Sequence, residues 1–299
     1  MNLGNLLKDI PDINVDINID LTKFTTMKLI ANGDLITVLA ISALKEVTKT
    51  LTRNNVSYII LGWGANMLLK KQSTLPYIKL DFPFDRNIFE TSENYFKLPA
   101  SAPLSSLTAV AVQKGFKGWD VFTGIPATLG GAIAMNAGTN LGEIGSLIKE
   151  VVVVDKFGKE RTEIINEKSF SYRKNHFLKS GDIVVGATMK HFGIDEKIKT
   201  LIKEYLGKRN SSQPMQMKTC GCVFKNRKIV DKTCHAGGHI DRIGLKGLYY
   251  NGVQVSQVHA NFMENIGNAS YEDVLELIEI INDELNMTFG WTLETEVKL

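Results

Sequence analysis

The stretch TGIPATLGGAIAMNAGTNLGEIG, from Thr123 to Gly145, gives the strongest indication of how this chain folds. It holds six glycines among other small residues, which let a backbone approach a bulky ligand closely. Pro126, followed by Ala-Thr-Leu, predicts the first turn of a short helix. A tight crossing of structural elements would use the same small residues, so the stretch alone leaves a structural and a ligand-binding interpretation open.

Another glycine loop, LGWGANMLL, begins at Leu61 directly after VSYIIL, which predicts a buried strand over Val56–Leu61. In chain order it is the first glycine loop, and the stretch from Thr123 to Gly145 is the second. Gly62 and Gly64 permit positive φ and let successive N–H groups face one concavity, which suits a pyrophosphate. The loop lacks the third glycine of a Rossmann fingerprint, and taken alone it is more typical of a plain turn. Two such loops, each after a strand, indicate one large phosphate-bearing cofactor held from two sides.

The composition excludes several classes of protein. The chain has 299 residues, 44% of them apolar, and a net charge of +3 from lysines scattered along its length. We therefore expect a solubilising surface and no nucleic-acid partner. No apolar run approaches the ~20 residues of a membrane span, and the N-terminus carries acids where a signal peptide would be basic. Three cysteines give no disulfide framework, so we expect a reducing, cytoplasmic setting.

Periodicity and capping signals predict interspersed helices and strands, hence a mixed α/β chain of α+β character. Predicted helices cover Ala43–Arg53 with Ser42 as cap, Pro103 to Gly115, and Glu196–Asn210, which ends on Gly207. A fourth helix is predicted after Ser270, where Asp273 completes the cap. Its inner face is formed by Val274, Leu275, Ile278, Ile281 and Leu285. Predicted strands are a hairpin beginning at Val151–Asp155, the segment Asp182–Phe192, and the closing WTLETEVKL.

Six motifs, in order, resemble the UDP-N-acetylenolpyruvoylglucosamine reductase (MurB) family: LGWGAN, TGIPATLGGAIAMNAG, SYRKNHF, GCVFKN, GLKGLYYNGVQVSQVHANFMEN and LETEV. The resemblance runs from about Phe24 to Val297. It implies an FAD-binding domain of the PCMH/vanillyl-alcohol-oxidase type, with two α/β subdomains, over residues 1–195. An α+β domain that binds the UDP-sugar would follow over residues 196–299, in the compact form of the type II members. The family is cytoplasmic and makes a peptidoglycan precursor.

The resemblance also implies a reaction, in which NADPH reduces FAD and flavin N5 then passes hydride to C3 of the enolpyruvyl group of UDP-N-acetylglucosamine enolpyruvate. Arg173 matches the catalytic arginine, which would hold the carboxylate and stabilise the enolate. Glu296 matches the catalytic glutamate, which would support the enol. Cys222 falls on the proton donor for C2; a free thiol, with a pKa of about 8.5, is a far easier acid than an alcohol. Without the family, a surface ion pair and a solvent-facing acid would explain Arg173 and Glu296.

Further site residues are expected from the same motifs. We expect FAD to contact Gly62, Trp63, Gly64, Ala65, Asn66, Thr123, Gly124, Ile125, Pro126, Thr128, Gly131, Asn136 and Gly138. We expect the substrate to contact Tyr172, Lys225, Asn226, Gln254 and His259. His259 fits a satisfied core histidine equally well.

The cysteines allow other interpretations. Cys220, Cys222 and Cys234 with His235 or His239 are zinc-ligand types, but Cys-x-Cys is tighter than the usual spacing, and we expect no metal. A Cys220–Cys222 disulfide would be strained. Buried small hydrophobes fit Cys220 and Cys234 best. The rival functions are an FAD oxidase of another alcohol or sugar and a non-catalytic zinc or nucleotide-binding module. We expect a monomer.

Overall fold

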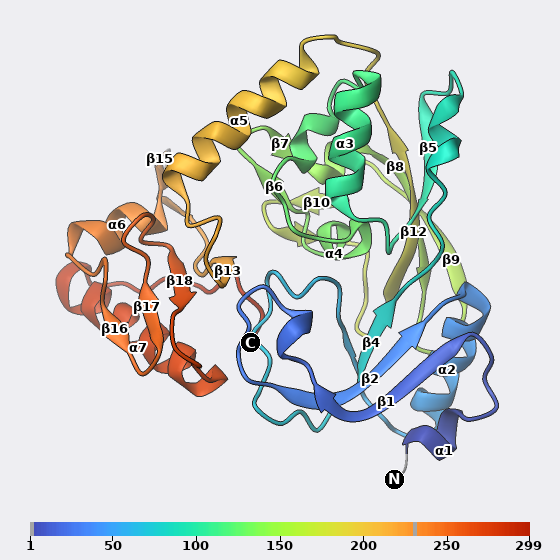
Figure 1. Ribbon diagram of the computed structural model, residues 1–299, viewed down its shortest axis with the longest axis horizontal. Helices are drawn as coiled ribbons and strands as arrows, with labels where there is room; N and C mark the ends of the chain where they lie inside the picture. Colours follow the sequence, from blue (N-terminus) through green and yellow to red (C-terminus); the bar gives the residue numbers. More distant parts are fainter. Residues whose placement is uncertain (1–2, 230–231) are drawn as a thin grey trace. The chain divides into compact units, whose positions relative to one another are not determined.

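The structure, a computed structural model, describes residues 3–229 and 232–299 (Figure 1). The chain packs into two compact units. The first unit comprises the chain up to Asn18, Asp34–Trp63 and Leu75–Gly207, and the second unit comprises Ile19–Gly33, Gly64–Thr74 and Lys208–Leu299. This division follows packing alone, and the expected domain boundary between residues 195 and 196 stays a prediction.

The main sheet of the first unit is antiparallel and four-stranded. Its strands lie in the order β5 (Tyr95–Pro99), β12 (Ile183–Lys190), β8 (Ile148–Val154) and β9 (Glu160–Ile164). Helices α3 (Leu104–Lys114) and α4 (Leu129–Ala134) pack on this sheet around the fully buried Trp119 and Phe122 (Figure 1). This core supports both the second glycine loop and the hairpin that carries Arg173.

A second sheet of the first unit has the order β1 (Ile13–Asp20), β2 (Asn32–Val38), β4 (Tyr77–Leu80) and β3 (Ile59–Ile60). The pairs β2–β4 and β3–β4 are parallel. Helices α1 (Leu3–Leu7) and α2 (Ile41–Arg53) share an apolar core with these strands. The short elements of this unit are η2 (Arg86–Glu90), η3 (Trp119–Phe122), η4 (Ile144–Leu147), β6 (Gly138–Thr139), β7 (Gly142–Glu143), β10 (Phe170–Ser171) and β11 (Lys174–Asn175).

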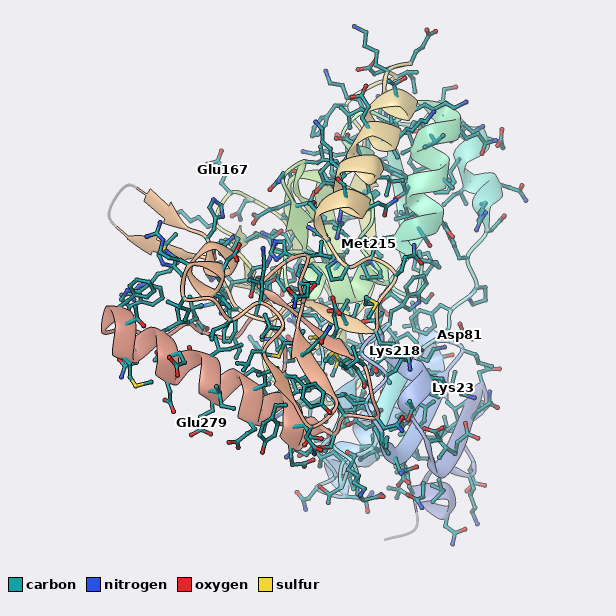
Figure 2. All side chains as sticks on the ribbon, turned by 60° about the vertical axis from the view of Figure 1, so that its left-hand side comes forward. Lys23, Asp81, Glu167, Met215, Lys218 and Glu279 are labelled. Carbon is teal, nitrogen blue, oxygen red and sulfur yellow. The ribbon has the colours of Figure 1, made fainter. Side chains whose placement is uncertain are left out.

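The second unit has an antiparallel sheet in the order β13 (Thr219–Cys222), β18 (Phe262–Asn265), β17 (Val253–Val255) and β16 (Tyr249–Tyr250). The long helix α7 (Tyr271–Phe289) packs its apolar face into the core of this unit. Figure 2 shows Glu279 on the opposite side of α7, pointing away from the strands. The remaining elements of this unit are α6 (Ala236–Arg242), the hairpin of β14 (Arg227–Ile229) and β15 (Lys232–Cys234), and η1 (Thr22–Phe24). Helix α5 (Ile198–Ser212) begins in the first unit, which ends at Gly207, and continues into the second.

Several predicted elements are confirmed. Helix α3 begins after Pro103 and ends at Gly115, whose φ of 73° gives the left-handed cap. Helix α7 has the complete capping box of Ser270 and Asp273, and four of the five predicted inner residues are buried, Leu275 being half-buried. The hairpin β8–β9 and the strand β12 also form where the pattern predicts them.

Four predictions are wrong in detail. Helix α2 begins at Ile41 after the extended Ala40, so Ser42 lies inside the first turn and is not the cap. Strand β3 covers only Ile59–Ile60 of the predicted Val56–Leu61. Helix α5 continues past Gly207, because a glycine in an exposed turn is tolerated. The closing segment forms only isolated bridges, at Thr295 and Lys298, because its partners are irregular segments and not a sheet edge.

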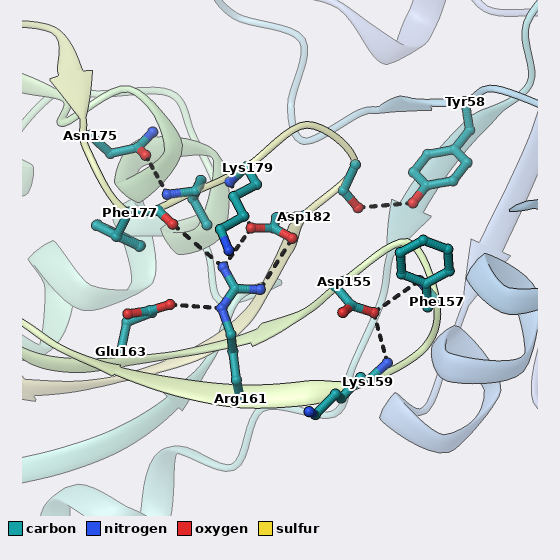
Figure 3. Close-up of polar contacts among 12 residues, drawn as sticks. Tyr58, Asp155, Phe157, Lys159, Arg161, Glu163, Asn175, Phe177, Lys179 and Asp182 are labelled. Carbon is teal, nitrogen blue, oxygen red and sulfur yellow. Dashed lines mark hydrogen bonds and ion pairs between the residues drawn. The ribbon is translucent and has the colours of Figure 1, made fainter.

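A buried ion pair fixes the end of the main sheet (Figure 3). Asp182, whose side chain is only 3% exposed, accepts hydrogen bonds from both terminal nitrogens of Arg161, the shorter at 2.5 Å. The Arg161 Nε also donates to Glu163 at 2.7 Å. The hydrogen bond to Asp182 raises the pKa of Arg161, outweighing the opposing effect of burial. The pair therefore ties β9 to the start of β12.

We predict that Arg161→Met destabilises the protein by about 3–5 kcal/mol, because it leaves the Asp182 carboxylate buried without its cation. Urea unfolding measures the change. The control is Lys114→Met, which removes the exposed pair with Glu90 and should cost less than about 1 kcal/mol. Equal, small losses in both variants would contradict the assigned role of Asp182.

The cap of α7 gives a pH-dependent prediction. Burial raises the pKa of Asp273, but hydrogen bonds from the Ser270 hydroxyl and amide outweigh it and leave the pKa lowered. The stabilisation is therefore present above the unfolded pKa of about 3.9 and is lost as the pH falls through the lower folded value. Asp273→Ala should cost about 1 kcal/mol at pH 7 in urea unfolding, and this difference from the unmutated protein should shrink in strongly acidic buffer.

The matched control for the cap is Glu279→Ala, on the exposed side of the same helix. It should change stability little at either pH, since no cap depends on it. A penalty for Asp273→Ala that stays constant down to pH 2 would show that the carboxylate charge plays no part.

Candidate active site

The two glycine loops meet in the first unit. A Cβ at Gly62 would lie 3.0 Å from the Thr128 Oγ1, and a Cβ at Gly130 would lie 2.8 Å from the Ala100 Cβ. Neither glycine could become a larger residue without displacing its neighbour. The two loops therefore lie close together, as expected if they hold one cofactor. This close approach is possible because Gly62 has no side chain.

Pro126 does not open the helix that follows. The amides of Ile125 and Ala127 are bound within a turn, and α4 begins only at Leu129. Its cap is Thr128, whose hydroxyl accepts from the Gly131 amide at 3.3 Å. The helix forms three residues later than the proline pattern predicts, because the loop first closes on itself.

The second glycine loop suits a phosphate-bearing cofactor. Between Thr123 and Gly138 there is no acidic side chain that would repel a diphosphate. Gly124, with φ of 72°, turns the loop, Gly124 and Ile125 are half-buried, and Gly131 is exposed. Fully buried Leu129 and Ile133 fix the opposite side in the core. A rigid, small-residue surface of this kind fits FAD.

The first glycine loop is divided between the two units. Gly62 and Trp63 belong to the first, and the residues from Gly64 belong to the second. Gly64 has φ of 59°, and a Cβ there would lie 2.6 Å from the Phe24 carbonyl oxygen, so only glycine fits. Asn66 donates through Nδ2 to the Glu296 carbonyl at 3.1 Å. This half of the loop is thus attached to the end of the chain.

Arg173 occupies an uncommon position in the two-residue turn between β10 and β11. Its φ of 55° is left-handed, which non-glycine residues adopt only at a cost in energy. The Nη2 donates to the Gly138 carbonyl at 2.9 Å, and Nη1 lies 4.0 Å from the Glu143 carboxylate. The guanidinium also lies over the Tyr172 ring. These contacts hold the predicted catalytic arginine against the second glycine loop.

Asn136 connects the same loop to the arginine hairpin. It is buried with φ of 49°, and its Nδ2 donates to the Glu143 carboxylate at 2.7 Å and the Ser171 carbonyl at 3.0 Å. Its Oδ1 accepts from the Gly145 amide at 3.1 Å. The side chain is therefore engaged within the protein, where it connects the loop to the hairpin that carries Arg173.

In the second unit, the cysteine motif lies beside the C-terminal segment. Phe224 pairs with Thr295, and the Glu296 amide donates to the Val223 carbonyl at 2.7 Å. Cys222, at the end of β13, directly precedes this pairing and is half-buried. Two of the three predicted catalytic residues, Cys222 and Glu296, thus come from adjacent segments that are far apart in sequence.

Asn261 holds the cysteine motif in place, and the sequence analysis missed it. Its Oδ1 accepts from the Phe224 amide at 2.9 Å, and its Nδ2 donates to the Phe224 carbonyl at 2.8 Å. The only sequence signal was an asparagine inside the motif VSQVHANF. The side chain is 3% exposed, so both bonds are shielded from water.

His259 is oriented by the same residue, because its Nδ1 accepts from the Asn261 amide at 3.2 Å. Burial lowers the pKa of His259, so the ring is neutral at pH 7 and carries its proton on Nε2. A neutral donor of this kind suits a polar ligand.

The other predicted substrate residues lie in the second unit, apart from Tyr172 in the arginine hairpin. Lys225 forms an ion pair with the exposed Glu294. The Asn226 side chain accepts from the Ala236 amide at 3.0 Å, and Gln254 donates to the buried Glu264 at 3.1 Å. Each is therefore anchored within its own unit.

A cavity of about 460 Å³ opens next to these residues. Four carboxamide side chains contribute to its lining, those of Asn210, Gln213, Gln216 and Gln257, together with Glu264 and Met215. Met215 lies on the segment between α5 and β13 (Figure 2). Such a lining can hydrogen-bond a neutral polar ligand from several directions.

The cysteines separate into three environments. Cys220 is buried, and burial raises its pKa to about 12. Cys222 and Cys234 are half-buried, and Cys234 contacts His239 in place of the apolar core expected for it. Within residues 3–229 and 232–299, no disulfide joins the three, and no group of three His, Cys, Asp or Glu side chains is placed to hold a metal ion. No helix in the described part of the chain is long and apolar enough to cross a membrane.

Comparison with known proteins gives matches at both ends of the chain. Residues 213–299 match the family "UDP-N-acetylenolpyruvoylglucosamine reductase, C-terminal domain", and residues 35–162 match "FAD binding domain". The UDP-N-acetylenolpyruvoylglucosamine reductase of Clostridium tetani is 31% identical over 99% of this chain and 95% of its own length. That of Clostridioides difficile is 34% identical over 86% of this chain and 83% of its own length.

A solved structure gives the same result. The crystal structure of UDP-N-acetylenolpyruvylglucosamine reductase (MurB) from Thermus caldophilus matches with a TM-score of 0.81 and 31% identity, over 96% of this chain and 98% of that one. The expected fold class, an FAD-binding domain followed by a C-terminal α+β domain, is confirmed. Because residues 213–299 match the C-terminal domain of this reductase family, nothing specific supports the alternative functions, an FAD oxidase or a zinc-binding module.

We predict that Asn261→Ala destabilises the protein by about 2–5 kcal/mol, because it leaves the Phe224 amide and carbonyl buried without partners. Urea unfolding monitored by circular dichroism measures the loss. Asn286→Ala, on the exposed end of α7, is the control and should be nearly neutral. A similarly small effect of Asn261→Ala would mean that water satisfies Phe224 and that the cysteine motif is not held by this side chain.

Proposed function

The chain belongs to the UDP-N-acetylenolpyruvoylglucosamine reductase family, and from this we propose that it reduces the enolpyruvyl ether of UDP-N-acetylglucosamine enolpyruvate to the lactyl ether of UDP-N-acetylmuramate. NADPH is the electron donor and FAD the cofactor. The product is a precursor of peptidoglycan, which links the enzyme to cell-wall synthesis, cell shape and cell division. The observation that carries the proposal is the similarity over nearly the whole chain to relatives of this one activity.

The chemistry that FAD would supply when bound is hydride transfer between NADPH and C3 of the enolpyruvyl group. The role of this chain is to hold the cofactor and to place the substrate beside it. The second glycine loop is partly exposed and has no acidic side chain between Thr123 and Gly138, which supports its assignment to the diphosphate. The Gly62 loop packs against Thr128 and supports the same site.

Arg173 is assigned to the carboxylate of the enolpyruvyl group. Hydride addition at C3 places negative charge at C2, which spreads into that carboxylate. A guanidinium has five N–H donors, so it can bind the carboxylate while it keeps its bond to Gly138. Because Gly138, Glu143 and the hairpin fix the guanidinium before substrate arrives, little reorganisation is needed as charge develops.

Cys222 is assigned to proton delivery at C2, and Glu296 to support of the enol. Their backbones adjoin through the pairing of Val223 with Glu296, which supports a shared task. A thiol that is protonated at neutral pH can donate and is then restored by solvent. Cys220 is unsuited to this role, because burial raises its pKa to about 12 and closes it off from substrate.

The substrate's neutral polar groups are assigned to the cavity lined by carboxamides, where His259 directly follows the lining residue Val258. We further propose that the protein is a monomer and acts in the cytoplasm. Sedimentation velocity tests the first of these, with a single 33.2 kDa species as the expected result.

We predict that Cys222→Ala keeps the reduction of bound FAD by NADPH but slows transfer to the substrate by about 10²–10⁴-fold, the contribution typical of a positioned acid. Anaerobic stopped-flow absorbance of the flavin separates the two half-reactions. Cys222→Ser should retain part of the second step.

Cys234→Ser is the matched control, because it changes a half-buried thiol elsewhere in the same unit. It should leave both half-reactions unchanged. Full turnover by Cys222→Ala would remove Cys222 from the mechanism, while leaving the assignment of the overall reaction intact.

A further inference from the structure

A thiol–imidazole pair lies in the second unit, outside the proposed catalytic residues. Cys234 is the last residue of β15, and His239 lies one turn into α6. The Cys234 Sγ and the His239 Nε2 are in hydrogen-bond contact. Cys234 is half-buried, so part of the residue is open to solvent.

The surroundings of His239 determine which of its nitrogens carries the proton. Its ring lies edge-on to Phe289 and Trp291, with centroids 5.4 and 5.0 Å away. Its Nδ1 is buried and has no hydrogen-bond partner among the described residues. A proton on Nδ1 would leave an unmatched donor in this apolar setting, whereas a bare nitrogen costs less. The proton therefore belongs on Nε2, which donates to the sulfur.

A donor that faces sulfur favours the negative charge that develops as a thiol loses its proton. Two cationic residues lie near the pair. Arg227 pairs with Cys234 across the hairpin and lies over Trp291, and Arg242 is close enough to influence the ring. Burial, followed by Arg242, lowers the pKa of His239, so the ring stays neutral at pH 7.

We propose that Cys234 is a modification site at which His239 promotes thiol–disulfide exchange with low-molecular-weight disulfides. In the step, the Cys234 thiolate attacks one sulfur of the disulfide RSSR. A new bond forms between Sγ and that sulfur, the original S–S bond breaks, and the other half leaves as RS⁻, which takes a proton from solvent. Cys234 is oxidised to a mixed disulfide, and the leaving half is reduced to the thiol RSH.

The test uses the full-length protein with bound FAD and 5,5′-dithiobis(2-nitrobenzoate) as the disulfide at pH 7. Samples are quenched in acid over time, digested, and analysed by mass spectrometry, so that the labelling rate of each cysteine is obtained separately. We expect Cys234 to react faster than Cys220, and faster than Cys234 does in the guanidinium-unfolded chain. His239→Gln should slow the Cys234 rate by about tenfold, and excess dithiothreitol should reverse the labelling.

Two further variants keep the result interpretable. His239→Leu places an apolar side chain without a donor against Phe289 and Trp291, and should slow Cys234 in the same way even if His239→Gln folds poorly. His235→Gln changes the neighbouring exposed histidine and should leave the rate unchanged. The proposal is overturned if Cys234 reacts at the same rate with and without His239, or no faster in the folded protein than in the unfolded chain.

Discussion

The pairing of the C-terminal segment with the cysteine motif is the interaction on which the second unit's share of the site depends. Leu293 and Val297 are buried in the core of this unit, and they fix the segment on both sides of Glu296. Backbone bonds to Val223 and Lys225 then set its register against Cys222. The last residues of the chain are therefore structural as well as catalytic in the proposed mechanism, and their burial explains why a segment without a sheet partner is held in one position.

In the first unit, Arg173 is held in position by contacts of a different kind. The arginine stands in a tight turn at a left-handed φ, a conformation that only surrounding contacts can maintain. Gly138 and Glu143 receive its guanidinium, and Asn136 ties the loop to the hairpin. Hydrogen bonds thus join the cation that would stabilise the enolate to the loop that would hold the cofactor.

The sequence predicts an element correctly where local signals determine it. It does not where a contact with a residue far away in the chain determines the structure. Helices α3 and α7 and the hairpin β8–β9 follow from caps, turns and periodicity, and the six motifs identify the family. Ser42 was misread because its helix begins one residue earlier, at Ile41, and Pro126 because the loop closes on itself before the helix begins at Leu129. The closing strand was misread because alternation cannot show whether a sheet edge is present. Asn261 and the Cys234–His239 contact depend on folding and had no readable pattern.

The proposed function requires a bound flavin that passes electrons from NADPH to the enolpyruvyl sugar nucleotide. The most direct measurement is an anaerobic visible spectrum of the purified protein with FAD, taken as NADPH is added, its excess removed, and UDP-N-acetylglucosamine enolpyruvate supplied. We expect the flavin absorbance bands to bleach when NADPH is added and to return when the substrate is added. Bleaching without recovery would contradict the assigned acceptor, and the absence of flavin bands after reconstitution would contradict the assignment of the glycine loops.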